Sequence, residues 1–275
     1  MSGLLLKNGR VLDYFPTELD AEAVPRVEDV DLRIVGDRIV TRGNGLEPAA
    51  DDEVVDLKGA TVMPGNVNAH GHLYAGLAAG MPLPDDVPLE SFTDILTAIW
   101  WPLDRSLDAD ATYLSALAGS WDAVRCGTTL IFDHHASLAS VGGSLDRVED
   151  GIAEVGLRGC LCYETTDRGG KGQRDITLEE NERYLQKILE AEQNGVPRFR
   201  AMVGAHASFT LEDKTLGLLA DMCDRFDAGL HIHLAEGTTD REVSADRGWP
   251  DPLGRLDAAG LVRPGSIFAH GVDLT

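Results

Sequence analysis

The sequence has little basic charge and no long apolar run. Its 24 lysines and arginines stand against 46 aspartates and glutamates, which gives a formal net charge of −22. Nucleic-acid binding needs basic surfaces that neutralise phosphates, so we expect no nucleic-acid partner. No segment approaches the roughly 20 consecutive apolar residues that a membrane-spanning helix requires, so we also expect no membrane partner.

Cysteine is scarce as well. The chain has four cysteines and no Cys-x-x-Cys pair, so we interpret them as reduced thiols in a core, not as a disulfide framework or a zinc knuckle. The N-terminus has no basic segment followed by an apolar stretch and a cleavage site. We therefore expect no secretory signal and a cytoplasmic location.

Residues 1–61 are typical of a β-rich segment. Short apolar runs at 4–13, 30–40 and 53–57 predict strands, with turns at Asn8-Gly9 and Gly36-Asp37. We interpret this segment as a small N-terminal β-sandwich, part of a composite domain whose C-terminal part is absent. We expect no catalytic group in it.

After residue 61, short apolar runs alternate with helix-like stretches. The runs lie at 60–63, 128–132, 157–163, 199–204, 229–234 and 266–269, and the helices are expected near 108–125, 145–155, 178–194, 211–226 and 251–259. This alternation predicts an α/β fold with a parallel sheet. We expect residues 62–275 to form an incomplete TIM-type (β/α) barrel with about six of the eight strands. The chain is therefore expected to be the front part of a longer protein.

All eight histidines lie in or just after a predicted strand. In a barrel these strand ends converge on one mouth, and imidazole is both a common metal ligand and the usual acid–base group near neutral pH. His70 and His72 are spaced i, i+2 and share one face of a strand, so both can reach one metal ion. His231 and His233 share a face in the same way, and one of them can bind while the other supports it.

Further candidates follow the later strands. Glu236 lies three residues after His233, where a carboxylate could shuttle a proton from metal-activated water. His206 and His270 end the predicted fourth and sixth strands. Each could polarise a substrate carbonyl or ring nitrogen, or could be a buried structural histidine. His135 is expected to line the pocket.

These motifs together resemble the amidohydrolase superfamily. The likeness lies in Val62-Met-Pro-Gly-Asn-Val-Asn-Ala-His70-Gly-His72-Leu, Gly229-Leu-His-Ile-His233-Leu-Ala-Glu236 and Ala269-His270-Gly. Within the superfamily, the chain is most similar to the branch of cytosine, guanine and S-adenosylhomocysteine deaminases and chlorohydrolases, in particular to SsnA-type aminohydrolases. The resemblance implies a metal-dependent hydrolase of carbon–nitrogen bonds other than peptide bonds, foremost an aminohydrolase (deaminase) of a heterocyclic amine.

The resemblance also assigns roles. It implies that His70, His72 and His233 bind one divalent metal ion, zinc or iron, and that Glu236 is the general acid–base. By the same likeness, His206 contacts the small-molecule substrate and His270 helps to orient water or substrate. The strand with His206 has no lysine that could bridge two metals, which favours one ion. In the full-length form we expect a homo-oligomer.

One family feature is missing from the predicted strands. The last metal ligand of the family is an aspartate at the end of the eighth strand, and Asp273 does not occupy that position. We therefore expect residues 1–275 alone to be poorly stable or inactive. A truncated, catalytically inactive metal-binding fragment remains one alternative, and a chlorohydrolase or cyclic-amide hydrolase of the same superfamily is the other.

Overall fold

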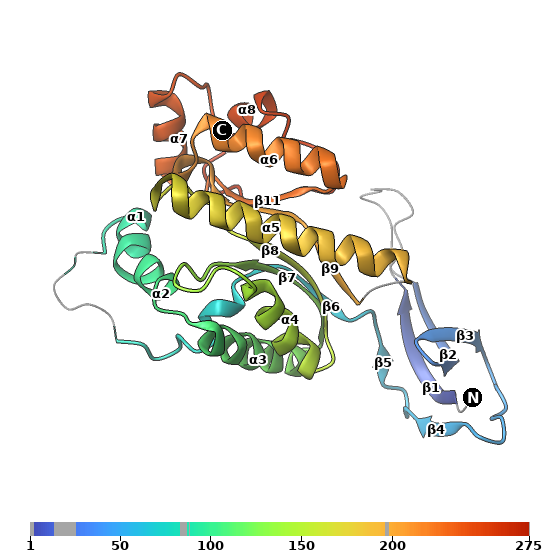
Figure 1. The fold of residues 1–275 in the computed structure, drawn as a ribbon. Coiled ribbons are helices and arrows are strands. Elements are labelled where there is room, and N and C mark those ends of the chain that lie inside the picture. The colour runs from blue at the N-terminus through green and yellow to red at the C-terminus, as the bar shows by residue number, and fades with distance from the viewer. Residues whose placement is uncertain (1–2, 14–25, 83–86, 88, 196–197, 275) are drawn as a thin grey trace. The chain divides into compact units, whose positions relative to one another are not determined.

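The computed structural model describes residues 3–13, 26–82, 87, 89–195 and 198–274 (Figure 1). It divides into two compact units, residues 1–65 and 66–275. The boundary predicted between residues 61 and 62 lies inside the first unit.

The first unit is one sheet. Its strands are β1 (Gly3–Asp13), β2 (Arg26–Val35), β3 (Arg38–Gly43), β4 (Glu53–Asp56) and β5 (Thr61–Val62). The order is β3-β2-β1-β4, with β5 also paired to β1. Strands β1, β2 and β3 pair antiparallel, whereas β4 and β5 run parallel to β1. Val11, Val30 and Leu32 form its buried apolar cluster.

The two predicted turns have different outcomes. Gly36-Asp37 does connect β2 to β3, as expected. The turn at Asn8-Gly9 is wrong, because both residues lie inside β1. The pairing of β1 with β2 shifts register between Leu6 and Gly9, and Asn8 has a φ of +57°. Asparagine tolerates this left-handed conformation, so the chain forms an irregularity within one strand instead of reversing.

The second unit is built on parallel strands. They are β6 (Asn66–Gly71), β7 (Thr128–His135), β8 (Arg158–Tyr163), β9 (Phe199–Ala201), β10 (Val203–Ala207), β11 (Leu230–Leu234) and β12 (Ile267–His270). The sheet orders are β6-β7-β8-β9 and β10-β11-β12, and all these pairs are parallel. The predicted α/β class is confirmed, and within the described residues the sheets do not close into a barrel.

Two strand predictions need correction. The run 60–63 was expected to begin the barrel, but its Thr61–Val62 pairs with β1 and Val62 packs on the first unit's core. The first strand of the parallel sheet is β6 instead. The run 199–204 is not one strand, because the chain changes partners at Met202. The Met202 N–H donates to Leu161, in β8, and the next N–H donates to Gly229, just before β11.

Helices of the second unit cover the parallel strands (Figure 1). They are η1 (Leu73–Ala75), α1 (Phe92–Ile95), η2 (Leu96–Trp100), α2 (Trp101–Asp104), α3 (Ala109–Arg125), α4 (Ser144–Glu154), α5 (Gly170–Gln193), η3 (Ser208–Thr210), α6 (Asp213–Phe226), α7 (Thr238–Asp246) and α8 (Pro252–Ala258). The predictions for α3, α4, α6 and α8 are confirmed to within two residues. Helix α5 starts earlier than predicted. The short helices α1, η2 and α2 and the nine-residue helix α7 were not predicted. No described helix is long and apolar enough to cross a bilayer.

Two apolar clusters lie between the strands and the helices. One includes Ile131, Leu145 and Tyr163, and the other includes Leu219 and Ile232. Burial of these side chains fixes the strands, since each large apolar side chain contributes about 1.5–3 kcal/mol when it leaves water. The carboxyl ends of the strands then carry the polar groups into one region.

Candidate metal centre

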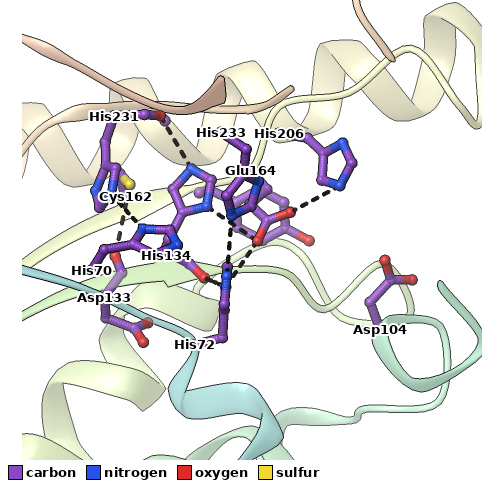
Figure 2. A network of polar contacts seen from close by, with 12 residues as sticks. His70, His72, Asp104, Asp133, His134, Cys162, Glu164, His206, His231 and His233 are labelled. Atoms are coloured by element: carbon purple, nitrogen blue, oxygen red, sulfur yellow. Dashed lines mark hydrogen bonds and ion pairs between the residues drawn. The ribbon is translucent and has the colours of Figure 1, made fainter. Parts of the chain in front are cut away.

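Seven of the eight histidines gather where five parallel strands end. Figure 2 labels His70, His72, His134, His206, His231 and His233. The ring contacts among them join His70 of β6, His72 just after it, His134 of β7, His206 of β10, His231 and His233 of β11, and His270 of β12. This convergence is what the parallel topology predicts, because all carboxyl ends lie at one edge of the sheet.

His70, His72 and His233 form a nearly equilateral triangle of rings. Their ring centroids lie 4.9 Å apart for His70–His72 and 5.0 Å apart for His70–His233 and His72–His233. Imidazoles that bind one tetrahedral zinc ion through nitrogens at ~2.0–2.1 Å have ring centres about 5 Å apart. The Nε2 atoms of His72 and His233 are 3.1 Å apart. Donor atoms lie within 4.8 Å of one another in two groups that share His233: His70, His233 and His270, and His72, His134, Glu164 and His233. The ring spacing and these groups mark the surroundings of His233 as a candidate metal site.

His70 has an unused donor atom at this place. Its Nδ1 contacts the Nε2 atom of His231 at 2.8 Å, whereas its Nε2 atom is buried and has no hydrogen-bond partner. An unpaired polar atom in the interior costs free energy, and a bound cation would satisfy it. The chemistry of the donor set therefore fits a divalent ion such as zinc. His231 contacts the other ring nitrogen of His70, Nδ1, and so fixes the orientation of this ring.

Glu236 lies beside the triangle. Its Oε2 atom is 3.4 Å from the Nε2 atom of His270, and burial raises its pKa to about 7. The ring of His270 stacks on His233 with centroids 5.3 Å apart. His270 has a φ of +83°, in the left-handed region that residues other than glycine rarely adopt. Glu236 thus has both the position and the pKa to hold or release a proton near neutral pH.

His206 is buried and neutral. Desolvation lowers its pKa to about 3. The hydroxyl of Thr210 donates to the Ala207 carbonyl at 3.0 Å, so it accepts from the Nδ1–H of His206 at 2.8 Å. The Nε2 atom of His206 therefore carries a lone pair. It can accept a hydrogen bond from a substrate, whereas polarising a carbonyl would need a donor at this nitrogen.

His135 faces other residues of the fold. It is fully buried, its Nε2 atom lies 2.9 Å from the Ser137 hydroxyl, and its ring contacts Tyr74 and Tyr163. It is not among the described residues that line the cavity beside the triangle. The predicted substrate contact of His135 stays a prediction, and its position does not support it.

A cavity of about 320 Å³ opens beside the histidine triangle. Its polar lining includes His70, His72, Asp104, Glu164, His206, His233, Glu236, Asp240 and His270, and its apolar lining includes Tyr74, Phe92, Leu96, Trp100, Trp101 and Phe209. Among the described lining residues there is no lysine or arginine. The cavity thus combines aromatic walls with groups that accept hydrogen bonds.

Three acidic residues of this cavity, Asp104, Glu164 and Asp240, were not predicted from the sequence. Glu164 directly follows β8 and is 3% exposed, whereas Asp104 ends α2 and is 2% exposed. Burial raises the pKa of Asp104 to about 6. Its Oδ2 atom accepts from Arg168 at 2.9 Å, and its buried Oδ1 atom has no partner. Glu164 could have been found by the criterion used for the histidines, since it is polar and ends a predicted strand. Asp104 gave no such signal.

Comparison with known proteins agrees with this architecture. The sequence profile of the amidohydrolase family matches residues 61–275. A 5'-deoxyadenosine deaminase of Methanothermobacter thermautotrophicus is 31% identical over 268 residues, which cover 97% of this chain and 58% of that protein. A 5-methylthioadenosine/S-adenosylhomocysteine deaminase of Thermococcus sibiricus is 29% identical, with 99% and 58% covered. The chain thus spans little more than half the length of these relatives.

Solved structures show the same fold. An adenosine deaminase from Xanthomonas campestris with bound zinc superposes with a TM-score of 0.77 at 24% identity, covering 99% of this chain and 58% of that one. A guanine deaminase from C. acetobutylicum with bound guanine superposes with a TM-score of 0.80 at 13% identity, covering 99% and 63%.

Proposed function

Since the chain belongs to the amidohydrolase family, we propose that it hydrolyses a carbon–nitrogen bond as a metal-dependent aminohydrolase, releasing ammonia from a heterocyclic amine. One observation carries this proposal. The three rings of His70, His72 and His233 are spaced for a single ion, and Glu236 lies next to them with a pKa near 7.

We assign His70, His72 and His233 as ligands of one divalent ion, zinc or iron. When bound, such an ion lowers the pKa of water and so provides a nucleophile at neutral pH. The zinc-bound deaminase among the structural neighbours supports this assignment. The unpaired Nε2 atom of His70 supports it from within the chain.

Glu236 moves the proton in this proposal. Its carboxylate takes a proton from the attacking water while the water oxygen bonds to the ring carbon, and it then gives that proton to the departing nitrogen. The carbon–nitrogen bond breaks, and ammonia leaves. The remaining hydroxyl proton moves to the adjacent ring nitrogen, which gives the oxo-heterocycle. His270, at 3.4 Å from Glu236, orients the carboxylate for both transfers.

The cavity selects a flat substrate that carries hydrogen-bond donors. Trp100, Trp101 and Phe209 provide aromatic walls. The Nε2 atom of His206 can only accept a hydrogen bond. The Oδ1 atom of Asp104 is also an acceptor when the carboxylate is ionised, at a pH above its pKa of about 6. Apart from the proposed metal ion, the described lining has no cation that could pair with an anionic substrate. A neutral 6-aminopurine nucleoside, the kind of compound named for the curated relatives, is the first candidate.

Ammonia release tests the proposal. The protein, expressed from its complete reading frame and loaded with zinc, is incubated with adenosine, 5'-deoxyadenosine, 5'-methylthioadenosine, guanine and amino-triazines. We expect ammonia from at least one purine, and Glu236→Gln should lower kcat by about 10²–10⁴-fold. The matched control is Glu242→Gln, an exposed glutamate of α7, which should keep full activity.

Two results would contradict this function. One is the absence of ammonia from every amine tested with zinc bound. The other is equal turnover by the wild-type protein and Glu236→Gln. Release of chloride from a chlorinated triazine without ammonia would favour the chlorohydrolase alternative. Zinc binding without any turnover would favour a catalytically inactive metal-binding fragment. The homo-oligomer and the cytoplasmic location expected from the sequence remain predictions.

A further inference from the structure

Glu164 is a buried carboxylate surrounded by imidazoles. In the described part of the chain, imidazole nitrogens surround its carboxylate: its Oε1 atom lies 3.2 Å from Nδ1 of His72 and 3.2 Å from Nδ1 of His134, and its Oε2 atom lies 3.8 Å from Nε2 of His206 (Figure 2). Burying a carboxylate away from water costs several kcal/mol, so its place among these rings needs a physical reason.

The ring of His72 shows what the carboxylate does. Its Nε2 atom faces His233, on the side of the triangle. Its Nδ1 atom, on the other edge of the ring, faces the carbonyl oxygen of His134 at 2.7 Å and the Glu164 carboxylate at 3.2 Å. Both neighbours are acceptors, so Nδ1 carries the proton. A neutral His72 then has its lone pair on Nε2, the form that a metal ligand needs.

The backbone of Glu164 links β8 to β7 beside the second acceptor, the His134 carbonyl. Nε2 of His134 donates to the carbonyl of His231 at 3.1 Å. Its Nδ1 atom lies 3.2 Å from Oε1 of Glu164, but neither of these two atoms has a hydrogen-bond partner. The backbone N–H of Glu164 donates to the carbonyl of His135 at 2.8 Å, which ties the ends of β7 and β8 together. Glu164 and His134 thus brace His72 from two sides.

We propose that Glu164 is a positioning residue of the metal centre, which fixes the tautomer and the orientation of His72. The proposal rests on the proposed function only in requiring that His70, His72 and His233 bind a divalent ion. The competing role for Glu164 is direct ligation, because donor atoms of His72, His134, Glu164 and His233 also lie within 4.8 Å of one another. The orientation of His72 favours the positioning role, since its Nε2 atom points to His233 and its Nδ1 atom to Glu164.

A measurement of zinc affinity distinguishes a role of Glu164 in the metal centre, as a positioning residue or a ligand, from a purely structural role. Glu164→Gln keeps the shape of the side chain and removes the charge. We expect zinc to bind at one ion per chain but about 10–100-fold more weakly, measured by competition with a chelator. The matched control is Glu180→Gln: Glu180 is 2% exposed and accepts hydrogen bonds from Gly143 and Leu145, away from the histidines. The zinc affinity of the Glu180→Gln variant should stay within about threefold of that of the wild type.

Cobalt substitution identifies the ligand set. The absorption of bound Co²⁺ reports its coordination number, and we expect the wild type and Glu164→Gln to give the same band positions and intensities. A spectrum that loses one oxygen donor in the variant would make Glu164 a ligand and overturn the proposal. An unchanged zinc affinity would overturn it as well.

A measurement on the wild-type protein covers the case in which Glu164→Gln does not fold. In zinc-loaded protein labelled with ¹⁵N-histidine, His72 should carry its proton on Nδ1, whereas a proton on Nε2 contradicts the inference. The two proposals also fail separately. A wild-type protein that binds no zinc refutes the metal centre itself, whereas zinc binding with a normal affinity in Glu164→Gln refutes the role of Glu164 alone.

Discussion

Ala235, between His233 and Glu236, adopts a backbone conformation that its neighbours must enforce. Its φ is +49°, which costs an L-residue about 1–2 kcal/mol relative to the right-handed form. Its N–H donates to Oδ2 of Asp240 at 2.9 Å, and its carbonyl accepts from the N–H of Asp273 at 2.9 Å. This turn aims Glu236 at the histidine triangle, so Asp240 controls the position of the proposed acid–base group.

The expected magnitude follows from these contacts. Asp240 is 2% exposed, and a hydrogen bond to such a carboxylate contributes about 1.5–3 kcal/mol. The middle of that range lies above the middle of the cost of the left-handed Ala235, about 1–2 kcal/mol, so removing the carboxylate lets the turn relax. We predict that Asp240→Ala lowers the free energy of unfolding by about 2 kcal/mol. A shift of Glu236 by about 1 Å should lower kcat about 100-fold.

A second substitution tests the cause. Glycine adopts a positive φ without the steric cost, so Ala235→Gly in the Asp240→Ala background should hold the turn and restore at least tenfold in kcat. Asp246→Ala, an exposed aspartate at the end of the same helix, should leave kcat unchanged. The assay is ammonia release with zinc bound, with urea unfolding for stability. Full activity in Asp240→Ala, or no recovery in the double variant, would refute the reasoning.

Three further predictions concern pH, packing and metal removal. Burial raises the pKa of Asp104 to about 6 in the folded state, so the stability it contributes is complete below about pH 4 and is lost as the pH rises through 6. Asp104→Asn should remove about 3 kcal/mol of this dependence, measured by urea unfolding at pH 4 and 7, and parallel curves for the two proteins would contradict the assignment. A Cβ at Gly204 would lie 2.2 Å from the Tyr163 carbonyl oxygen, so Gly204→Ala should destabilise the protein by about 1–3 kcal/mol; an unchanged urea midpoint would refute this. Removing zinc with a chelator should lower Tm, because an ion held at 100 times its Kd stabilises the folded state by about 2.7 kcal/mol; an equal Tm with and without the chelator would argue against the site.

Much of the fold could be predicted from the sequence because its signals are local. The alternation of apolar runs and helical stretches indicated β7, β8, β11 and β12 and the longer helices, and each is present. The wrong predictions concern segments whose structure depends on pairing with strands far away in the sequence. Thr61–Val62 has the composition of a barrel strand, yet it pairs with β1. The helix expected near 178–194 begins instead at Gly170, and the hydroxyl of Thr177 donates to the Arg174 carbonyl inside α5.

The candidate metal centre shows why a histidine-rich motif cannot be divided into ligands and supports from sequence alone. The i, i+2 spacing places His231 and His233 on one face of β11, and both carry the same donor atoms. Only the structure shows that His231 contacts Nδ1 of His70, while His233 faces Nε2 of His72. The supports come from other strands, as Glu164 does. A site in which His70 and His72 each have a hydrogen-bond partner outside the proposed ligand set can keep its shape before a metal ion binds. This preformed arrangement lowers the cost of ordering the ligands on binding.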